Sequence, residues 1–199
     1  MKKTLSTVAL LAAVLTLAGC GNSSGGSTGM SSSHSASSSH NKQDVTFAQQ
    51  MIPHHQQAIV LAKMATTHAG SRAVKQLAGR IEAAQGPEIK TMTGWLKAWG
   101  QHKSSSSMPG MAGMGGMRGS ISSMPGMMSK TGMAKLQHAT GRRFDTMFLR
   151  GMITHHRGAL QMASTEIANG KNPDAVALAK KIKTAQTLQI AEMKQMLNS

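Results

Sequence analysis

The sequence contains no tyrosine, only three phenylalanines and two tryptophans, and a single cysteine, Cys20. One cysteine forms no disulfide within the chain, and if Cys20 is lipidated the mature protein also has no thiol, so any soft-metal chemistry then has to use methionine and histidine. Acidic residues are also scarce, since seven Asp and Glu stand against 22 Lys and Arg and give a net charge of +15. Such a basic excess is typical of proteins that bind nucleic acid or an anionic membrane surface. The few aromatics and the lack of a recognised binding motif argue against nucleic acid.

The N-terminus has the features of a bacterial lipoprotein signal peptide, which we assign to residues 1–19. Lys2 and Lys3 precede a short apolar run at 5–17, well below the roughly twenty residues that span a bilayer. The following LAGC resembles a lipobox, in which cleavage precedes a cysteine whose thiol is acylated. The alternative is a plain signal peptide with a chance cysteine. We expect an exported chain, anchored to the membrane by a lipid on Cys20 and facing the extracytoplasmic or periplasmic space.

Low-complexity segments divide the remaining chain. Residues 20–41 hold Cys20 and a Gly/Ser-rich stretch with too little apolar surface to order itself, so we expect a flexible tether. Residues 104–130 form a second such stretch, rich in Ser, Gly, Pro and Met. It separates two periodic regions, 44–99 and 145–198, within a folded domain that we place at 42–199.

The two periodic regions are copies of each other. A shift of 101 residues places 44–96 on the second region without a gap, and 16 of these 53 positions are identical. The spacing of the identities is kept throughout, so we interpret the pattern as an internal duplication.

Each copy has the apolar periodicity of two amphipathic helices. Asp44 and Asp145 are suitable N-caps for the first helix of each copy. The pattern breaks near Gly70 and before Pro173, which suits the first turn of a helix. A short extra helix is expected from Met133 to Thr140. Two helical hairpins predict an all-α fold, most economically a four-helix bundle, since neither hairpin buries its apolar stripe alone.

Both copies carry the segment Met-Ile-X-His-His on the first helix. At 100° per residue, His54 and His55 lie on either side of Met51 on the apolar face, and the same holds in the second copy. Buried imidazoles need partners. The structural interpretation is a hydrogen bond to a carbonyl or acid, and the functional one is metal ligation, which the duplicated pairs favour.

The segments FAQQMIPHHQQAIVLA and FLRGMITHHRGALQMA, each followed by a Leu-Ala…Gln…Ile…Met helix, resemble the DUF305 family. The resemblance covers about 42–199. It implies a ferritin-like four-helix bundle in an exported bacterial protein, and some members are implicated in copper binding and tolerance. Leu61 stands where the second copy has Met162, so the two copies need not be equal. The ligands implied are Met51, His54, His55, Met152, His155, His156 and Met162.

The inter-repeat loop adds a second set of candidate ligands. Its methionines recur at Met-x-x-Met spacing, which lets several thioethers converge on one soft ion. Their Gly and Ser neighbours are expected to keep them out of a core. The alternative is an oxidisable loop without a specific ligand. The candidates are Met108, Met111, Met114, Met117, Met124, Met127 and Met128.

These patterns favour a binding protein over an enzyme, since no nucleophile, triad or acid–base pair is visible. We expect it to sequester or transfer copper, with Cu(I) favoured and Cu(II) as the alternative. A metal-dependent oxidase and a purely structural or interaction domain are the competing hypotheses. A di-iron centre is disfavoured because no Glu-x-x-His pair occurs. Beyond the metal ion and the membrane, the partners considered are a second copy of the chain and a copper-handling protein.

Overall fold

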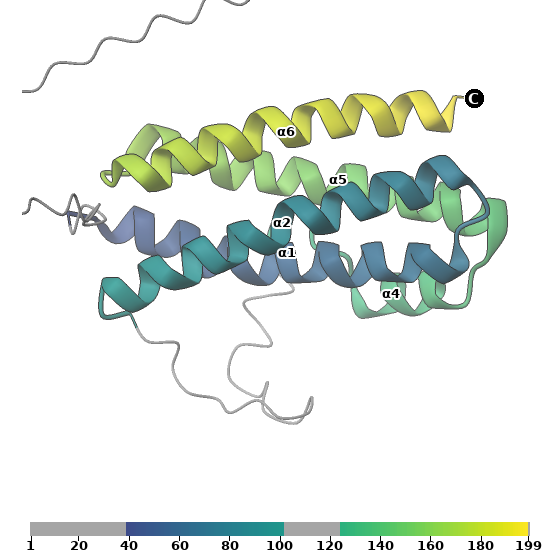
Figure 1. Cartoon of the computed structure of the whole chain (residues 1–199), viewed down its shortest axis with the longest axis horizontal. Coiled ribbons are helices and arrows are strands. Elements are labelled where there is room, and N and C mark those ends of the chain that lie inside the picture. The colour runs from purple at the N-terminus through teal and green to yellow at the C-terminus, as the bar shows by residue number, and fades with distance from the viewer. Residues whose placement is uncertain (1–38, 102–123, 199) are drawn as a thin grey trace, which may run out of the picture. The chain divides into compact units, whose positions relative to one another are not determined.

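The computed structural model describes residues 39–101 and 124–198. Within these ranges the chain forms five α-helices and no extended strand (Figure 1), which confirms the all-α prediction. None of these helices is both long and apolar enough to cross a membrane. The helices are α1 (Lys42–His68), α2 (Arg72–Ala98), α4 (Lys130–Gln137), α5 (Gly141–Asn169) and α6 (Pro173–Leu197).

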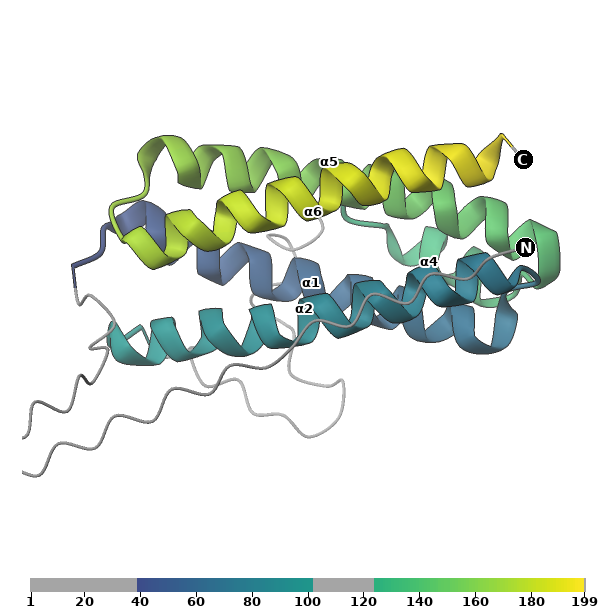
Figure 2. The same ribbon diagram turned by 45° about the horizontal axis from the view of Figure 1, so that its top comes forward.

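Each copy of the repeat forms one helical hairpin, α1 with α2 and α5 with α6. The hairpins meet mainly through α1 and α5 (Figures 1 and 2). An ion pair between Arg80 and Glu192 links the two outer helices, α2 and α6. The short α4 touches both α1 and α5. The two hairpins thus bury their apolar stripes against each other in the four-helix bundle that the duplication predicts.

The prediction that Asp44 and Asp145 are N-caps is wrong. The N-cap of α1 is Asn41, whose side chain accepts N–H bonds, and Asp44 completes a capping box from the third helical position. The N-cap of α5 is Thr140, so Asp145 lies inside the first turns of that helix. Periodicity places the start of a helix only to within a few residues, because the chain can begin a helix at any nearby capping residue.

The two aspartates instead tie the hairpins together. Each carboxylate accepts two backbone N–H groups from the turn that precedes the second helix of the other hairpin. Asp44 thereby holds the turn that leads into α6, and Asp145 holds the turn that leads into α2, whereas the N-caps of these two helices are Asn172 and Ser71. The donors to Asp44 are Lys171 (3.0 Å) and Asn172 (2.9 Å), and those to Asp145 are Gly70 (3.1 Å) and Ser71 (2.9 Å).

The end of the inter-repeat loop departs from the prediction. The expected helix at 133–140 is α4, which starts earlier because the Ser129 side chain accepts the Gly132 N–H group. Met124 is buried, and Met128 packs against the core, so the expectation that loop methionines stay out of the core is wrong for these two. Pro125 and its neighbours form a turn that rests on α5, and this brings Met124 inward despite its Gly and Ser surroundings.

The core consists of two apolar clusters along the bundle. On α1, one cluster holds residues up to Ile52 and the other begins at Ala58. On α5 the order is reversed: the cluster that contains Ala58 includes residues up to Ile153, and the cluster that contains Ile52 begins at Ala159. The His-His segments therefore lie at the boundary between the clusters. Helix α1 continues through Pro53, immediately before the first histidine pair.

Candidate metal site

A polar layer crosses the bundle between the two apolar clusters. Each of the four long helices contributes two side chains to it, at positions that are 101 residues apart in the two copies. The four histidines have no exposed surface, as the helical wheel predicts, and the two innermost glutamines are each 3% exposed. The members of the polar layer are His54, His55, Gln85, Glu88, His155, His156, Gln186 and Gln189.

His54 and His155 face each other at the centre of the layer. Their ring centroids are 3.7 Å apart, with the ring planes inclined at 35°. His54 Nε2 donates to the carbonyl of Pro125 at 3.1 Å, whereas neither ring nitrogen of His155 makes a hydrogen bond. Burial lowers the pKa of His54 to about 3, and the nearby His55 adds to the shift. Burial likewise lowers the pKa of His155 well below its ordinary value. Both rings are therefore neutral at pH 7 and keep a lone pair.

The outer histidines are held from the second helix of their own hairpin. His55 Nε2 lies 2.8 Å from Glu88 Oε2, and His156 Nε2 lies 2.7 Å from Gln189 Oε1. Burial lowers the pKa of His156 to about 4, although its bond to Gln189 opposes the shift. A neutral ring that donates from Nε2 to such an oxygen keeps its lone pair on Nδ1.

Buried polar atoms without hydrogen-bond partners gather in this layer. The described ranges contain nine such side-chain atoms, and seven of them belong to the polar layer. They include Nδ1 of all four histidines, Nε2 of His155, and Oε1 of Gln85 and Gln186. An unmet buried polar group costs about 1–3 kcal/mol. A bound cation would give the imidazole lone pairs the partner that the protein itself does not supply.

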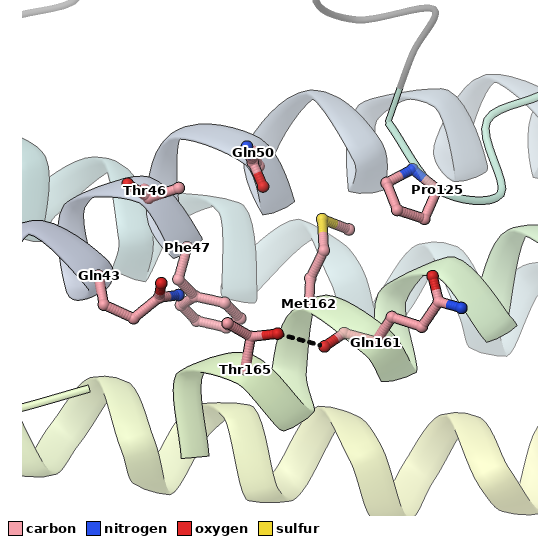
Figure 3. Close-up of a pocket in the computed structure, with 8 residues that line it drawn as sticks. All are labelled: Gln43, Thr46, Phe47, Gln50, Pro125, Gln161, Met162 and Thr165. Atoms are coloured by element: carbon pink, nitrogen blue, oxygen red, sulfur yellow. Dashed lines mark hydrogen bonds between the residues drawn. The ribbon is translucent and has the colours of Figure 1, made fainter. Parts of the chain in front are cut away.

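The methionines of the implied ligand set lie close to the layer along the helices. Met51 and Met152 are fully buried, one helical turn before the histidines. Met162 is 7% exposed, and it lines a cleft of about 210 Å³ between α1 and α5. Its side chain extends from α5 between Gln50 and Pro125 (Figure 3). Within the described ranges, His, Cys, Asp and Glu side chains form no group of three or more that could hold a metal ion.

Residues 124–128, which we call the docked turn, cover His54. The Gln57 side chain brackets this turn, since it accepts from Met128 N–H at 2.8 Å and donates to the Met128 carbonyl at 3.0 Å. On the opposite side, a Cβ at Gly158 would clash with the carbonyl of Pro125. Gln57 and Gly158 occupy equivalent positions of the two copies. The first copy therefore binds the docked turn through a side chain, and the second copy allows its close approach because it has a glycine at the same position.

A pair of carboxyl groups lies near one end of the bundle. Burial raises the pKa of Glu166 to about 8, and contact with Asp44 adds to this shift. Burial also acts to raise the pKa of Asp44, but hydrogen bonds from the Asn41, Asn172 and Lys171 backbone outweigh it, and the net pKa is lowered. At pH 7 Glu166 therefore carries the proton and Asp44 the negative charge.

Some predicted site residues lie outside the described residues. They are the lipidation candidate Cys20 and the loop methionines Met108, Met111, Met114 and Met117. The remaining loop candidates Met124, Met127 and Met128 all belong to the docked turn. The end of the Met-rich loop is thus attached to the polar layer, through the bond between Pro125 and His54.

The polar members of α2 and α6 were not among the predicted site residues. Gln85 and Gln186 are identical in the two copies and lie between apolar positions of an amphipathic helix, where a polar residue is unexpected. That exception could have identified them. Glu88 and Gln189 carry no comparable signal, because they differ between the copies and each is partly exposed.

The sequence between residues 44 and 197 matches DUF305, a domain of unknown function. The chain belongs to the DUF305 family. A DUF305 protein of Streptomyces coelicolor that is described as secreted shares 29% identity, over 78% of this chain and 92% of that one, with a TM-score of 0.68. A DUF305 fragment from Deinococcus radiodurans shares 30% identity over 79% and 97% of the two chains, with a TM-score of 0.66.

The solved structures similar to this DUF305 protein also include CopM. Its Cu(II)-bound form shares 34% identity over 78% of this chain and 95% of that one, with a TM-score of 0.63. CopM has also been solved with Cu(I), with silver and without metal. A comparison with curated protein sequences found no match. The family resemblance is therefore confirmed, and metal-bound relatives share the bundle.

Proposed function

We propose that this protein binds copper at the polar layer and that it sequesters or transfers the ion outside the cytoplasm. The observation that carries the proposal is the gathering of seven unpartnered buried atoms in one layer, four of them imidazole Nδ1 atoms. A structural role alone leaves these groups as an unmet cost at the centre of the fold. A metal ion bound in the layer would give these polar atoms a partner and so remove the free-energy cost.

The donor set fits copper. Neutral imidazole binds both copper oxidation states, and thioether sulfur selects Cu(I). The ligands that we propose are the four histidines of the polar layer together with Met51, Met152 and Met162. The loop methionines form a second set of ligands that binds the ion more weakly. Copper- and silver-bound CopM supports a soft ion as cargo, because silver is a mimic of Cu(I). We therefore favour Cu(I), with Cu(II) as the alternative.

We also propose that the protein is exported and held at the membrane by a lipid on Cys20. The signal-like N-terminus and the LAGC segment support this proposal. The Streptomyces coelicolor relative, described as secreted, is consistent with export. Metabolic labelling with a radioactive fatty acid in a bacterial host tests the anchor, and Cys20→Ala should abolish the label.

Copper titration of purified protein tests the central proposal. Changing His54, His55, His155 and His156 to alanine should abolish tight binding. A matched variant with His40, His68 and His138 changed to alanine should bind as the unaltered protein does, since these residues lie outside the layer. Equal binding by the two variants would overturn the proposal.

Thermal stability gives a second measurement. A ligand that binds only the folded state stabilises it by about 2.7 kcal/mol at a concentration one hundred times its Kd. Copper should therefore raise the melting temperature of the unaltered protein and of the matched variant. A purely structural role for the histidines predicts no rise. An oxidase would in addition turn over Cu(I) or a phenol, which the same copper-loaded sample tests.

A further inference from the structure

The two copies hold their outer histidines in the same way but with different chemical groups. His55 and His156 are equivalent residues, and so are Glu88 and Gln189. Both Nε2-to-oxygen distances fall between 2.7 and 2.8 Å, and both rings are fully buried. The difference between the two arrangements is therefore a carboxylate in the first hairpin against a neutral amide in the second.

A carboxylate restricts the imidazole more strongly than an amide does. Its oxygens only accept, so a neutral imidazole beside it has to donate from Nε2 and keeps its lone pair on Nδ1. The Gln189 amide has both an oxygen and an NH₂ group, so rotating its side chain by half a turn accommodates either tautomer of His156. A carboxylate partner also makes a ligating imidazole more basic and fixes its orientation.

In the part of the chain that the structure describes, His55 is the residue that forms an ion pair with the Glu88 carboxylate. Within the described ranges, the ion pairs join Lys63 to Glu82, Arg80 to Glu192 and His55 to Glu88, so no lysine or arginine there competes for the Glu88 carboxylate. The Glu88 side chain is 20% exposed, whereas the histidine is fully buried. The carboxylate thus binds Nε2 from the solvent-exposed edge of the layer, and Nδ1 of His55 has no hydrogen-bond partner.

We infer that Glu88 is a positioning residue that presents Nδ1 of His55 to copper, and that replacement of this acid by Gln189 makes the second hairpin the weaker half of the site. The inference rests on the proposed function. It adds that the two copies differ in affinity and that copper loads the His55 half first.

Two isosteric substitutions test the inference on the full chain. Glu88→Gln converts the first hairpin to the arrangement of the second, and Gln189→Glu does the reverse. Competition with a Cu(I) chelator under anaerobic conditions measures affinity. Mutation of the hydrogen-bond partner of a ligating histidine typically weakens metal binding about 10–100-fold. We expect Glu88→Gln to weaken the tighter binding step by that factor and Gln189→Glu to tighten the weaker step.

The order of loading provides a readout that a purely structural role would not change. Nitrogen NMR of labelled histidine, with resonances assigned by single substitutions, should show His55 shifting before His156 as copper is added. The double variant Glu88→Gln with Gln189→Glu should reverse this order. An unchanged order, or equal affinities in all four proteins, overturns the inference.

The metal-free protein separates this inference from the proposed function. The same spectra should show His55 as a single tautomer with hydrogen on Nε2, and Glu88→Gln should introduce the second tautomer. If the unaltered protein binds no copper, the proposed function fails and the loading order fails with it. If copper binds but Glu88→Gln changes neither the tautomer nor the affinity, the inference alone fails. Circular dichroism confirms that each isosteric variant is folded.

Discussion

His155 offers a direct test of whether the polar layer exists for ligand binding or for stability. Both of its ring nitrogens are buried and without partners. Replacement by leucine, a side chain of similar size, removes two unmet polar atoms and leaves the apolar contacts in place. Each such atom costs about 1–3 kcal/mol. We therefore expect His155→Leu to raise the free energy of unfolding of the metal-free protein at pH 7 by at least about 1 kcal/mol.

The pH dependence of this effect follows from the depressed pKa of His155. An unfolded histidine takes up a proton below a pH of about 6.5, whereas the buried ring stays neutral. The unfolded state then binds more protons, so the free energy of unfolding falls as the pH is lowered. Between pH 7 and pH 5 the loss is about 2 kcal/mol for each such histidine. His155→Leu should make this loss smaller by that amount.

Urea unfolding of metal-free protein at pH 7 and pH 5 measures both effects. The groups that titrate in both proteins, Glu166 among them, cancel to first order when the two are compared. His68→Leu is a suitable control, because His68 Nδ1 has hydrogen-bond partners and its removal should give no gain in stability. A His155→Leu protein that is less stable at pH 7, or that loses as much stability at pH 5 as the unaltered protein, would refute the reasoning.

Three further perturbations test other parts of the structure. Asp44→Ala removes the hydrogen bonds that join the hairpins and should cost about 1–3 kcal/mol by urea unfolding. Gly158→Ala should expel the Pro125 carbonyl and expose His54, seen as faster reaction with diethyl pyrocarbonate, whereas Gly79→Ala on an open helix face should not. Glu166 keeps its proton to a pH of about 8, while an unfolded glutamate loses it near 4.5. The free energy of unfolding therefore carries a penalty that grows as the pH rises between these values, and Glu166→Gln should remove it in a urea titration series.

Much of the fold follows from the sequence, because the duplication repeats each signal. The apolar periodicity and the two Met-Ile-X-His-His segments predict the hairpins and the inward histidines. Long-range partners were not predictable in this way. Asp44 looked like a local N-cap because its type and position fit one, yet its acceptor atoms also serve a turn 127 residues away. Met124 looked exposed because its neighbours are polar, yet the docked turn brings it to the core.

In the candidate site, too, local features could be predicted from the sequence and contacts between helices could not. Histidine burial could be predicted from the helical wheel, since burial depends only on position along one helix. The partners of those histidines lie on other helices, where Glu88 and Gln189 have no distinguishing local pattern. Unmet hydrogen-bonding capacity is a property of the packed layer, so it becomes visible only once four helices are placed together.

The differences between the copies are as informative as their identities. A duplicated hairpin places its histidines in equivalent pairs about the centre of the bundle, so the metal ligands that we propose come in two matching halves. One docked turn cannot serve two equivalent halves, and it bonds to His54 while His155 stays free. Gln57 in one copy and Gly158 in the other are the side chains that permit this unequal arrangement. Because the chain departs from symmetry where it covers the layer, we expect the departures, and not the shared histidines, to set the order in which the two halves take up and release the ion.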